Sequence, residues 1–446
     1  MKLRTFTHKR ILLFGAPRAF SRDEFDRLLQ AAQITLAEAY DDDVDAVIEG
    51  RLINPIEQET LDRLYETRKV LPVSIDDFEK TLCSQIEPDR IIMSLKLTRD
   101  RDRLRAFLQN PYIDNDFFLK LLQLYDWGKE GFFESDENRD VTAALIGRYY
   151  ENLKRNHNVQ YSTLGLMHLL RETRRPRLIR VIGGLPPLRQ AVSSGDRQMR
   201  AVLEALALHP DTDEPTLKHF IRQGDDALKT LVAARPALDP ALQQELAGMN
   251  VPQINTALAA NPDLSPLLAD TLFADSRLAD IGYAHIRLHG GRYEKGRIGH
   301  ATALAANPSL TEAMQRQLYA SGDHAILCAL AANPALQIAD TLIADGEEIV
   351  MQTLAANPSL SAAQLEALAS TGCCDRALAG NGSAPARLLE ALYAKGESEV
   401  LLALAANHAT PVAILQQLQL DARFERAVRT NDAFGQFIQR ENIGWL

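Results

Sequence analysis

Arginines gather in one short stretch of the sequence. Residues 168–200 contain eight arginines against Glu172 and Asp196, which gives this stretch a local charge of +6. The planar guanidinium group forms paired hydrogen bonds with phosphate or carboxylate, so such a stretch could bind an anion or a nucleic acid. We therefore predict that its densest part, RETRRPRLIR, contributes the binding residues Arg171, Arg174, Arg175, Arg177 and Arg180.

A second basic stretch, HIRLHGGRYEKGRIGH at 285–300, contains four glycines. We interpret it as a glycine-rich loop that could bind an anion; the alternative is a solvated surface or pairing with acidic parts of the chain. His285 and His289 have the spacing of a helical metal pair, but no acidic or cysteine ligand is near them in sequence, so no metal site is predicted. The predicted binding residues are Arg287, Arg292, Lys295 and Arg297.

The sequence offers little that could carry catalysis. It has no HExxH, GxSxG, Walker or zinc-deaminase motif, and its four cysteines, Cys83, Cys328, Cys373 and Cys374, show no CxxC spacing. The Cys373–Cys374 pair could be reactive, and a buried position at a unit boundary is the alternative interpretation. We predict a protein that is not an enzyme, with no catalytic residue, no metal and no cofactor.

Composition is that of a folded protein: the chain has 446 residues, 46% hydrophobic and 24% charged. The net charge is −10, and residues 301–446 alone hold 8 basic and 15 acidic side chains. The N-terminus lacks an apolar signal core, and no run of 18 apolar residues exists. The cysteine usage indicates a reducing compartment. We therefore expect a cytoplasmic protein with no membrane association.

A short sequence motif recurs through the second half of the chain. ALAANP or TLAANP closes at Asn261, Asn307, Asn333 and Asn357, and degenerate copies end at His209, Arg235, Asn381, Asn407 and Asn431. Successive copies are 24 or 26 residues apart, except for one step of 46, which equals a standard step plus about 20 residues. A period of this size predicts a solenoid, in which each small unit buries its apolar face against its neighbours.

Residues 345–368 show how one unit is built. A helix runs into Ala355–Ala356, and Asn357 ends it, because asparagine tolerates the left-handed conformation and bonds local backbone. Pro358 cannot continue the helix and favours extended geometry at Asn357. Ser361 then caps a second helix with Gln364 as its capping-box partner. Glycines follow the second helices at Gly224, Gly322, Gly346, Gly372 and Gly396.

This unit resembles the variant leucine-rich repeat family in LAANP, the following leucine, the capping Ser/Thr/Asp and the final Leu-x-x-Leu. The resemblance covers roughly residues 200–435 and implies a right-handed superhelix in which an α-helix alternates with a shorter helix. HEAT-type repeats are the nearest alternative, but their units are longer, about 40 residues. Some family members bind an iron–sulfur cluster through N-terminal cysteines; this chain lacks that cluster of cysteines, so the resemblance implies no cofactor here.

Residues 1–84 follow a different pattern. Apolar runs at 10–15, 34–39, 44–48 and 70–73 predict strands, and helices are expected at 21–32, 55–68 and after Ser74. At the first of these helices, Ser21 is the expected cap and Glu24 its capping-box partner. Strands that alternate with helices predict a small α/β sandwich with a mainly parallel sheet.

The order of these elements resembles a BRCT domain in Phe14–Gly15, in VDAVIEG and in VLPVSIDDFEKTL, where Phe78 stands in place of the usual tryptophan. The resemblance implies binding of protein partners. The family's phosphate-binding Ser or Thr is replaced by Phe14, so a plain protein contact is expected in place of phosphopeptide binding. A flavodoxin-like fragment is the alternative, but its glycine-rich phosphate loop is absent.

The sequence therefore predicts a mainly α fold: a right-handed α-solenoid of 24–26-residue repeats at 201–446 with an insertion near 280–300, a helical region at 85–200 with divergent leading repeats, and a BRCT-like domain at 1–84. The expected function is a non-enzymatic scaffold for a protein partner. One alternative is a nucleic-acid-binding protein of DNA repair or defence that uses the arginines. Another is a helical-repeat DNA glycosylase, which would need a catalytic carboxylate in a basic groove.

Overall fold

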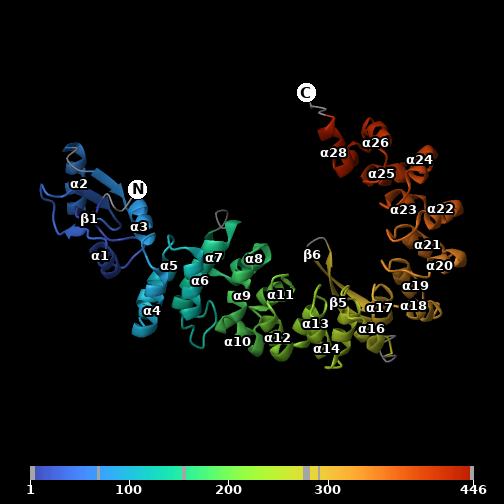
Figure 1. Ribbon diagram of the computed structural model, residues 1–446, viewed down its shortest axis with the longest axis horizontal. Helices are drawn as coiled ribbons and strands as arrows, with labels where there is room; N and C mark the ends of the chain where they lie inside the picture. The colour runs from blue at the N-terminus through green and yellow to red at the C-terminus, as the bar shows by residue number, and fades with distance from the viewer. Residues whose placement is uncertain (1–5, 68–70, 153–156, 275–281, 290–291, 442–446) are drawn as a thin grey trace. The chain divides into compact units, whose positions relative to one another are not determined.

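The computed structural model describes residues 6–67, 71–152, 157–274, 282–289 and 292–441 (Figure 1). The chain is mainly helical, with a small four-stranded sheet near its N-terminus. Backbone contacts divide it into two compact units, Met1–Gly224 and Asp225–Leu446, and each is described by itself.

The sheet of the first unit is entirely parallel. Its strands lie in the order β2-β1-β3-β4, and each neighbouring pair runs parallel. The predicted parallel α/β arrangement is therefore confirmed. Its elements are β1 (Arg10–Phe14), α1 (Arg22–Ala31), β2 (Thr35–Ala37), β3 (Ala46–Glu49), α2 (Pro55–Thr67), β4 (Leu71–Ser74) and α3 (Ile75–Cys83).

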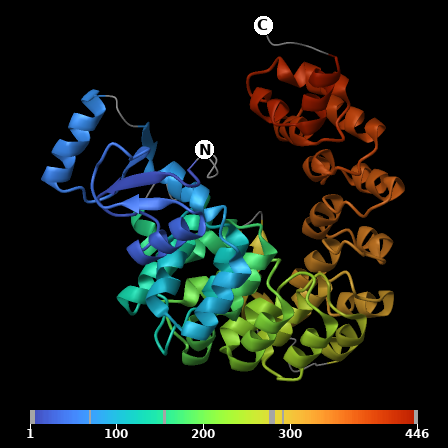
Figure 2. The same cartoon turned by 60° about the vertical axis from the view of Figure 1, so that its left-hand side comes forward.

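Helices cover both faces of this sheet (Figures 1 and 2). On one face, Leu61 of α2 joins a buried cluster with Leu12 and Phe14 of β1. Side chains alternate along a strand, so Leu13, between Leu12 and Phe14, points to the opposite face. There α1 and α3 contribute Phe25 and Phe78, whose ring centroids are 6.0 Å apart. The alternation of apolar residues thus builds two small cores from one sheet.

The rest of the first unit is made of short helices. Their ends are set by side-chain caps such as Asp100, Asp114 and Ser135, each of which accepts a hydrogen bond from the backbone N–H three residues on. The helices are α4 (Pro88–Thr98), α5 (Arg101–Gln109), α6 (Asn115–Leu124), α7 (Asp136–Tyr149), the 3₁₀ helix η3 (His157–Tyr161), α8 (Thr163–Glu172), α9 (Pro176–Gly184), α10 (Pro186–Ser194), α11 (Arg200–Leu208) and α12 (Glu214–Gln223).

A buried ion pair joins the sheet region to these helices. Ser21 accepts a hydrogen bond from the Glu24 backbone, as expected of a cap, but the Glu24 carboxylate does not complete the predicted capping box. It pairs with Arg103 of α5, at 2.7 Å from Nε and 3.0 Å from Nη2. Both side chains are largely buried. The ion pair was not predictable from local spacing, because its partners are 79 residues apart.

The second unit consists of helix pairs stacked one after another (Figure 1). Its elements are α13 (Asp226–Ala233), α14 (Pro240–Ala247), α15 (Pro252–Ala259), α16 (Pro266–Phe273), β5 (Gly282–His289), β6 (Arg292–Gly299), α17 (His300–Ala305), α18 (Glu312–Tyr319), α19 (His324–Ala331), α20 (Ala339–Asp345), α21 (Glu348–Ala355), α22 (Ala362–Thr371), α23 (Asp375–Gly380), α24 (Ala386–Lys395), α25 (Ser398–Ala406), α26 (Val412–Gln419), α27 (Glu425–Arg429) and α28 (Asp432–Arg440).

The repeated asparagines of this unit form a hydrogen-bonded ladder between repeats. In Asn333, Nδ2 donates to the carbonyls of Ala305 and Asn307 in the preceding repeat, each at 2.8 Å, and Oδ1 accepts from the Ala335 N–H. All members of the ladder are buried and bond in the same way. The asparagine ladder comprises Asn261, Asn307, Asn333, Asn357, Asn381, Asn407 and Asn431.

Of the two conformations considered for Asn357, left-handed and extended, the ladder asparagines take the extended one. Asn381 (φ −77°, ψ 119°) and Asn407 (φ −79°, ψ 122°) are extended, not left-handed. The left-handed positions are instead the predicted glycines that follow the second helices at Gly322, Gly346 and Gly372, with φ between 65° and 75°. Asparagine is therefore required for its side-chain bonds and not for its backbone freedom.

Alanine and leucine side chains pack around the ladder asparagines. The two residues before the asparagine are alanines in most repeats, and the earlier one, such as Ala305 or Ala331, is fully buried. Its carbonyl is one of those at a helix C-terminus that have no partner within the helix, and the next asparagine satisfies it. A methyl side chain lets the neighbouring repeat approach closely enough for this bond. Leu330 and Leu354, one position earlier, fill the core.

The 46-residue step is explained by an insertion that leaves the ladder intact. β5 and β6 form an antiparallel hairpin, so the basic stretch is not the loop that we expected. Asn307 still donates to the carbonyls of Ala259 and Asn261, at 2.7 Å each, across 48 and 46 residues. The hairpin is therefore inserted between two repeats that stack as if it were absent.

Replacing Asn333 by alanine should lower the free energy of unfolding of the second unit by about 2–4 kcal/mol, because two buried carbonyls and one N–H lose their partner. Urea denaturation followed by circular dichroism measures this change. Glu366→Ala is the matched control: this side chain is exposed on α22, and its loss should change stability by less than about 0.5 kcal/mol. Equal effects of the two substitutions would contradict a structural role for the ladder.

Candidate functional site

The first predicted cluster of arginines lies where α8 ends and α9 begins. Three of the five guanidinium groups contact the protein itself: Arg177 pairs with Asp116 at 2.5 Å, Arg180 lies 3.8 Å from Asp213, and Arg175 stacks over the Tyr149 ring. The exposed Arg171 and Arg174 have no ion-pair partner among the residues that the structure describes. The charge available to an external anion is therefore smaller than the sequence indicates.

The second predicted cluster lies on the β5–β6 hairpin. Arg287 is the cross-strand neighbour of Glu294, and Lys295 is that of Ile286. Side chains of this hairpin, including those of Arg292 and Arg297, lie outside what the structure describes. His285 and His289 are on one strand, where residues four apart are separated by about 13 Å, so the spacing of a helical metal pair does not apply.

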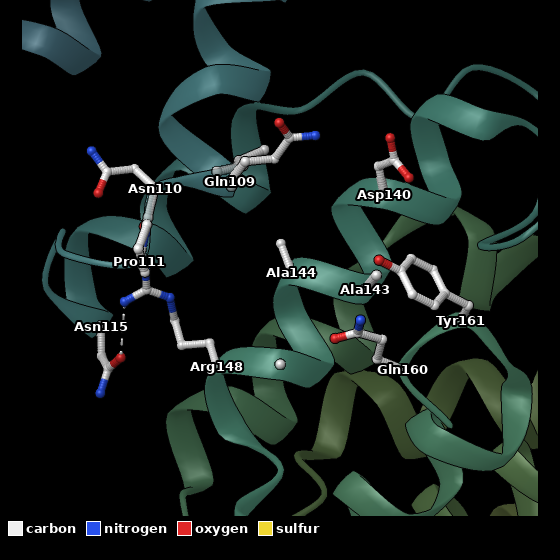
Figure 3. A pocket seen from close by; sticks show the side chains of 12 residues that line it. Gln109, Asn110, Pro111, Asn115, Asp140, Ala143, Ala144, Arg148, Gln160 and Tyr161 are labelled. Atoms are coloured by element: carbon white, nitrogen blue, oxygen red, sulfur yellow. Dashed lines mark hydrogen bonds between the residues drawn. The ribbon is translucent and has the colours of Figure 1, made fainter. Parts of the chain in front are cut away.

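A groove in the first unit brings together residues that the sequence analysis did not select (Figure 3). It has a volume of about 670 Å³. Its floor is the α7 surface at Ala143, Ala144 and Gly147. On one side stand Gln109 and Pro111, at the end of α5 and in the turn that follows it. The remaining lining includes Asn115, Asp140, Arg148, Gln160 and Tyr161.

Arg148 fixes one side of this groove. Its guanidinium donates to the carbonyls of Asn110 at 2.5 Å and Ile113 at 2.7 Å, and it lies 4.7 Å from the centre of the Phe118 ring. Burial lowers the pKa of Arg148. The same turn is closed by Asn110, whose Oδ1 accepts from the Tyr112 N–H as in the ladder. Arg148 therefore acts as a structural cation that replaces a ladder bond, and both of its Nη atoms are engaged with the protein.

Several polar groups in the groove remain available. Among the described residues, no side-chain hydrogen bond is made by Gln109, Asp140, Gln160 or Tyr161. A carboxamide has both donors and an acceptor, and Asp140 adds one carboxylate. Figure 3 shows the Gln109, Asp140, Gln160 and Tyr161 side chains around the alanines of α7. The groove can thus form several hydrogen bonds over a floor that allows close approach.

This arrangement lacks the elements of common catalytic sites. The groove contains no cysteine, histidine or lysine, and in the described part of the chain no group of three His, Cys, Asp or Glu side chains is placed to hold a metal ion. Its chemistry is recognition through hydrogen bonds and one negative charge. The one sequence signal for it was Asp140-x-x-Ala-Ala-x-x-Gly147, a polar residue and small residues on one helical face.

None of the helices in the described residues is long and apolar enough to cross a membrane. Comparison with protein-family models, with curated proteins and with solved structures finds no match to this chain. The interpretation of the groove therefore depends on its own residues.

If the groove is open as described, tryptophan at Ala144 should fill it at little cost. We expect Ala144→Trp to change the free energy of unfolding by less than about 1 kcal/mol, because the side chain points into the groove (Figure 3). Ala205→Trp is the matched control: Ala205 is buried on α11 and does not line the groove, so overpacking should destabilise the protein by about 1–3 kcal/mol or more. Urea denaturation distinguishes the two, and a large loss for Ala144→Trp would show that the site is packed and closed.

Proposed function

We propose that this protein is a non-enzymatic interaction scaffold whose first unit binds an extended segment of a partner protein in the groove on α7. The observation that carries the proposal is the set of polar side chains without partners among the described residues, Gln109, Asp140, Gln160 and Tyr161, around a floor of small residues.

Extended peptide is the ligand whose chemistry fits this lining best. An extended chain exposes one N–H and one C=O per residue, and glutamine side chains can pair with both. The alanine floor lets a backbone lie close to α7, where a larger side chain would keep it away. Asp140 favours a basic side chain in the bound segment, because the nearby Arg148 is engaged with backbone carbonyls.

Other ligand classes fit less well. Small-molecule pockets are mainly apolar and enclose most of their ligand, whereas the named polar groups are arranged on an open groove. Nucleic acid needs several available cations, and the one cation in the groove lining, Arg148, is bonded to backbone carbonyls. The exposed Arg171 and Arg174 are the specific observation that keeps nucleic acid as a second candidate, at the arginine cluster and not in the groove.

The remainder of the chain supports the scaffold proposal by its architecture. We infer that the stacked helix pairs of the second unit are variant leucine-rich repeats and that the N-terminal sheet domain is BRCT-like, which would give the protein further surfaces for protein partners. The order of strands and helices, β1-α1-β2-β3-α2-β4-α3, agrees with the second inference.

Peptide display tests the groove directly, because the selection itself supplies the ligand. Random 12-residue peptides selected on the full chain should share a basic position and should bind Ala144→Trp and Asp140→Lys at least about tenfold more weakly than the unmodified protein. Ala367→Trp, on an exposed position of α22, is the control and should bind normally. Selected peptides that bind Ala144→Trp as well as the unmodified protein would contradict the proposal.

The nucleic-acid candidate has its own test. We expect fluorescence anisotropy with labelled double- and single-stranded DNA to show weak binding at about 50 mM salt and none at about 200 mM. Tight binding with a steep salt dependence, lost in Arg171→Glu/Arg174→Glu but kept in Ala144→Trp, would replace the scaffold proposal by a nucleic-acid function.

A further inference from the structure

Three side chains of the second unit form a chain of contacts on the surface of two successive repeats. Cys328 and His324 are four residues apart on α19 and therefore lie on one face of the helix. Cys328 Sγ is 3.9 Å from His324 Nε2. The other ring nitrogen, Nδ1, contacts the carboxylate of Glu347, at the start of α21 in the next repeat. The order is thiol, imidazole and carboxylate, as in a nucleophile with a base and an orienting acid.

The fold holds these groups in place. Asp323 caps α19 through the N–H groups of Ala325 and Ile326, which fixes the helical turn that carries His324. Asn333 and Asn357 set the spacing between the ends of successive helices, and so place Glu347 beside His324. His324 and Glu347 are 49% and 41% exposed, and Cys328 is half-buried. A small molecule can therefore reach the thiol.

We propose that Cys328 is a nucleophilic thiol that reacts with hydrogen peroxide or a small neutral hydroperoxide, with His324 as its base and Glu347 as the residue that orients the imidazole. His324 takes the thiol proton, and the sulfur attacks one peroxide oxygen. An S–O bond forms as the O–O bond breaks, and the leaving hydroxide takes the proton from His324 to give water. The cysteine is oxidised to a sulfenic acid and the peroxide is reduced. This inference is independent of the groove.

Local charge selects a neutral oxidant. Asp323, Glu347 and Glu348 lie at the starts of α19 and α21, so anionic disulfides and oxyanions are repelled from the thiol. Two of the other cysteines, Cys83 and Cys374, differ from Cys328 in their surroundings. Burial raises the pKa of Cys83 and of Cys374 to about 12, so little reactive thiolate forms at either residue.

The test compares four cysteines in one protein. The full chain is treated with hydrogen peroxide at pH 7, sulfenic acid is trapped with dimedone, and each cysteine is quantified by peptide mass spectrometry. Cys328 should be labelled at least about tenfold faster than Cys83, Cys373 and Cys374. His324→Gln should slow the labelling of Cys328 by about tenfold and leave the labelling rates of the other three cysteines unchanged. Glu347→Gln should slow the labelling of Cys328 by a smaller factor.

A second measurement separates base catalysis from access. The neutral reagent iodoacetamide should still alkylate Cys328 of the unmodified protein at pH values where it no longer alkylates Cys328 of His324→Gln, because glutamine cannot take a proton. Two results would overturn the proposal. One is that Cys328 is labelled no faster than Cys373, which is equally half-buried. The other is that His324→Gln leaves the rate and the pH profile of Cys328 unchanged.

Discussion

The buried carboxamide of each ladder asparagine is the interaction on which the second unit depends. Its two N–H groups bond to carbonyls of the preceding repeat, and its oxygen bonds to an N–H of its own turn, so the polar group is satisfied away from water. The same bonds satisfy carbonyls that a helix end leaves without partners. Each ladder asparagine therefore closes its own turn, satisfies a carbonyl at the end of the helix in the preceding repeat and fixes the distance between the two repeats.

This constraint has consequences for function. A fixed step between repeats brings side chains of successive repeats into defined contact, as with His324 and Glu347. In the first unit the same task falls to other residues: Arg148 donates to the carbonyls of its neighbouring turn, and the His209 ring lies 3.0 Å from the Thr173 carbonyl. Larger side chains and unequal helices replace the alanines there, and the resulting irregular surface contains the groove.

Much of the repeat could be predicted from the sequence because its determinants are local. The period, the Ser361–Gln364 capping box and the parallel sheet follow from spacing and residue type. The hairpin was missed although Gly290–Gly291 between two apolar–polar runs is a hairpin signal. The groove could not be predicted, because Gln109 and Gln160 come to line one groove only through the packing of α5, α7 and η3. The pairing of Arg177 with Asp116 likewise depends on the packing of α9 against α6.

Hydrogen exchange of the turns tests the ladder most directly. The N–H groups of Ala335, Ser359, Ser383 and Ala409 lie outside helices, yet each bonds to a ladder asparagine. Residue-resolved exchange should therefore find these turn amides as protected as the helices on either side, and Asn357→Ala should release the amide of Ser359 and expose the end of α19. Rapid exchange of these amides in the unmodified protein would contradict the account, because it would mean that the side chains do not hold the repeats together.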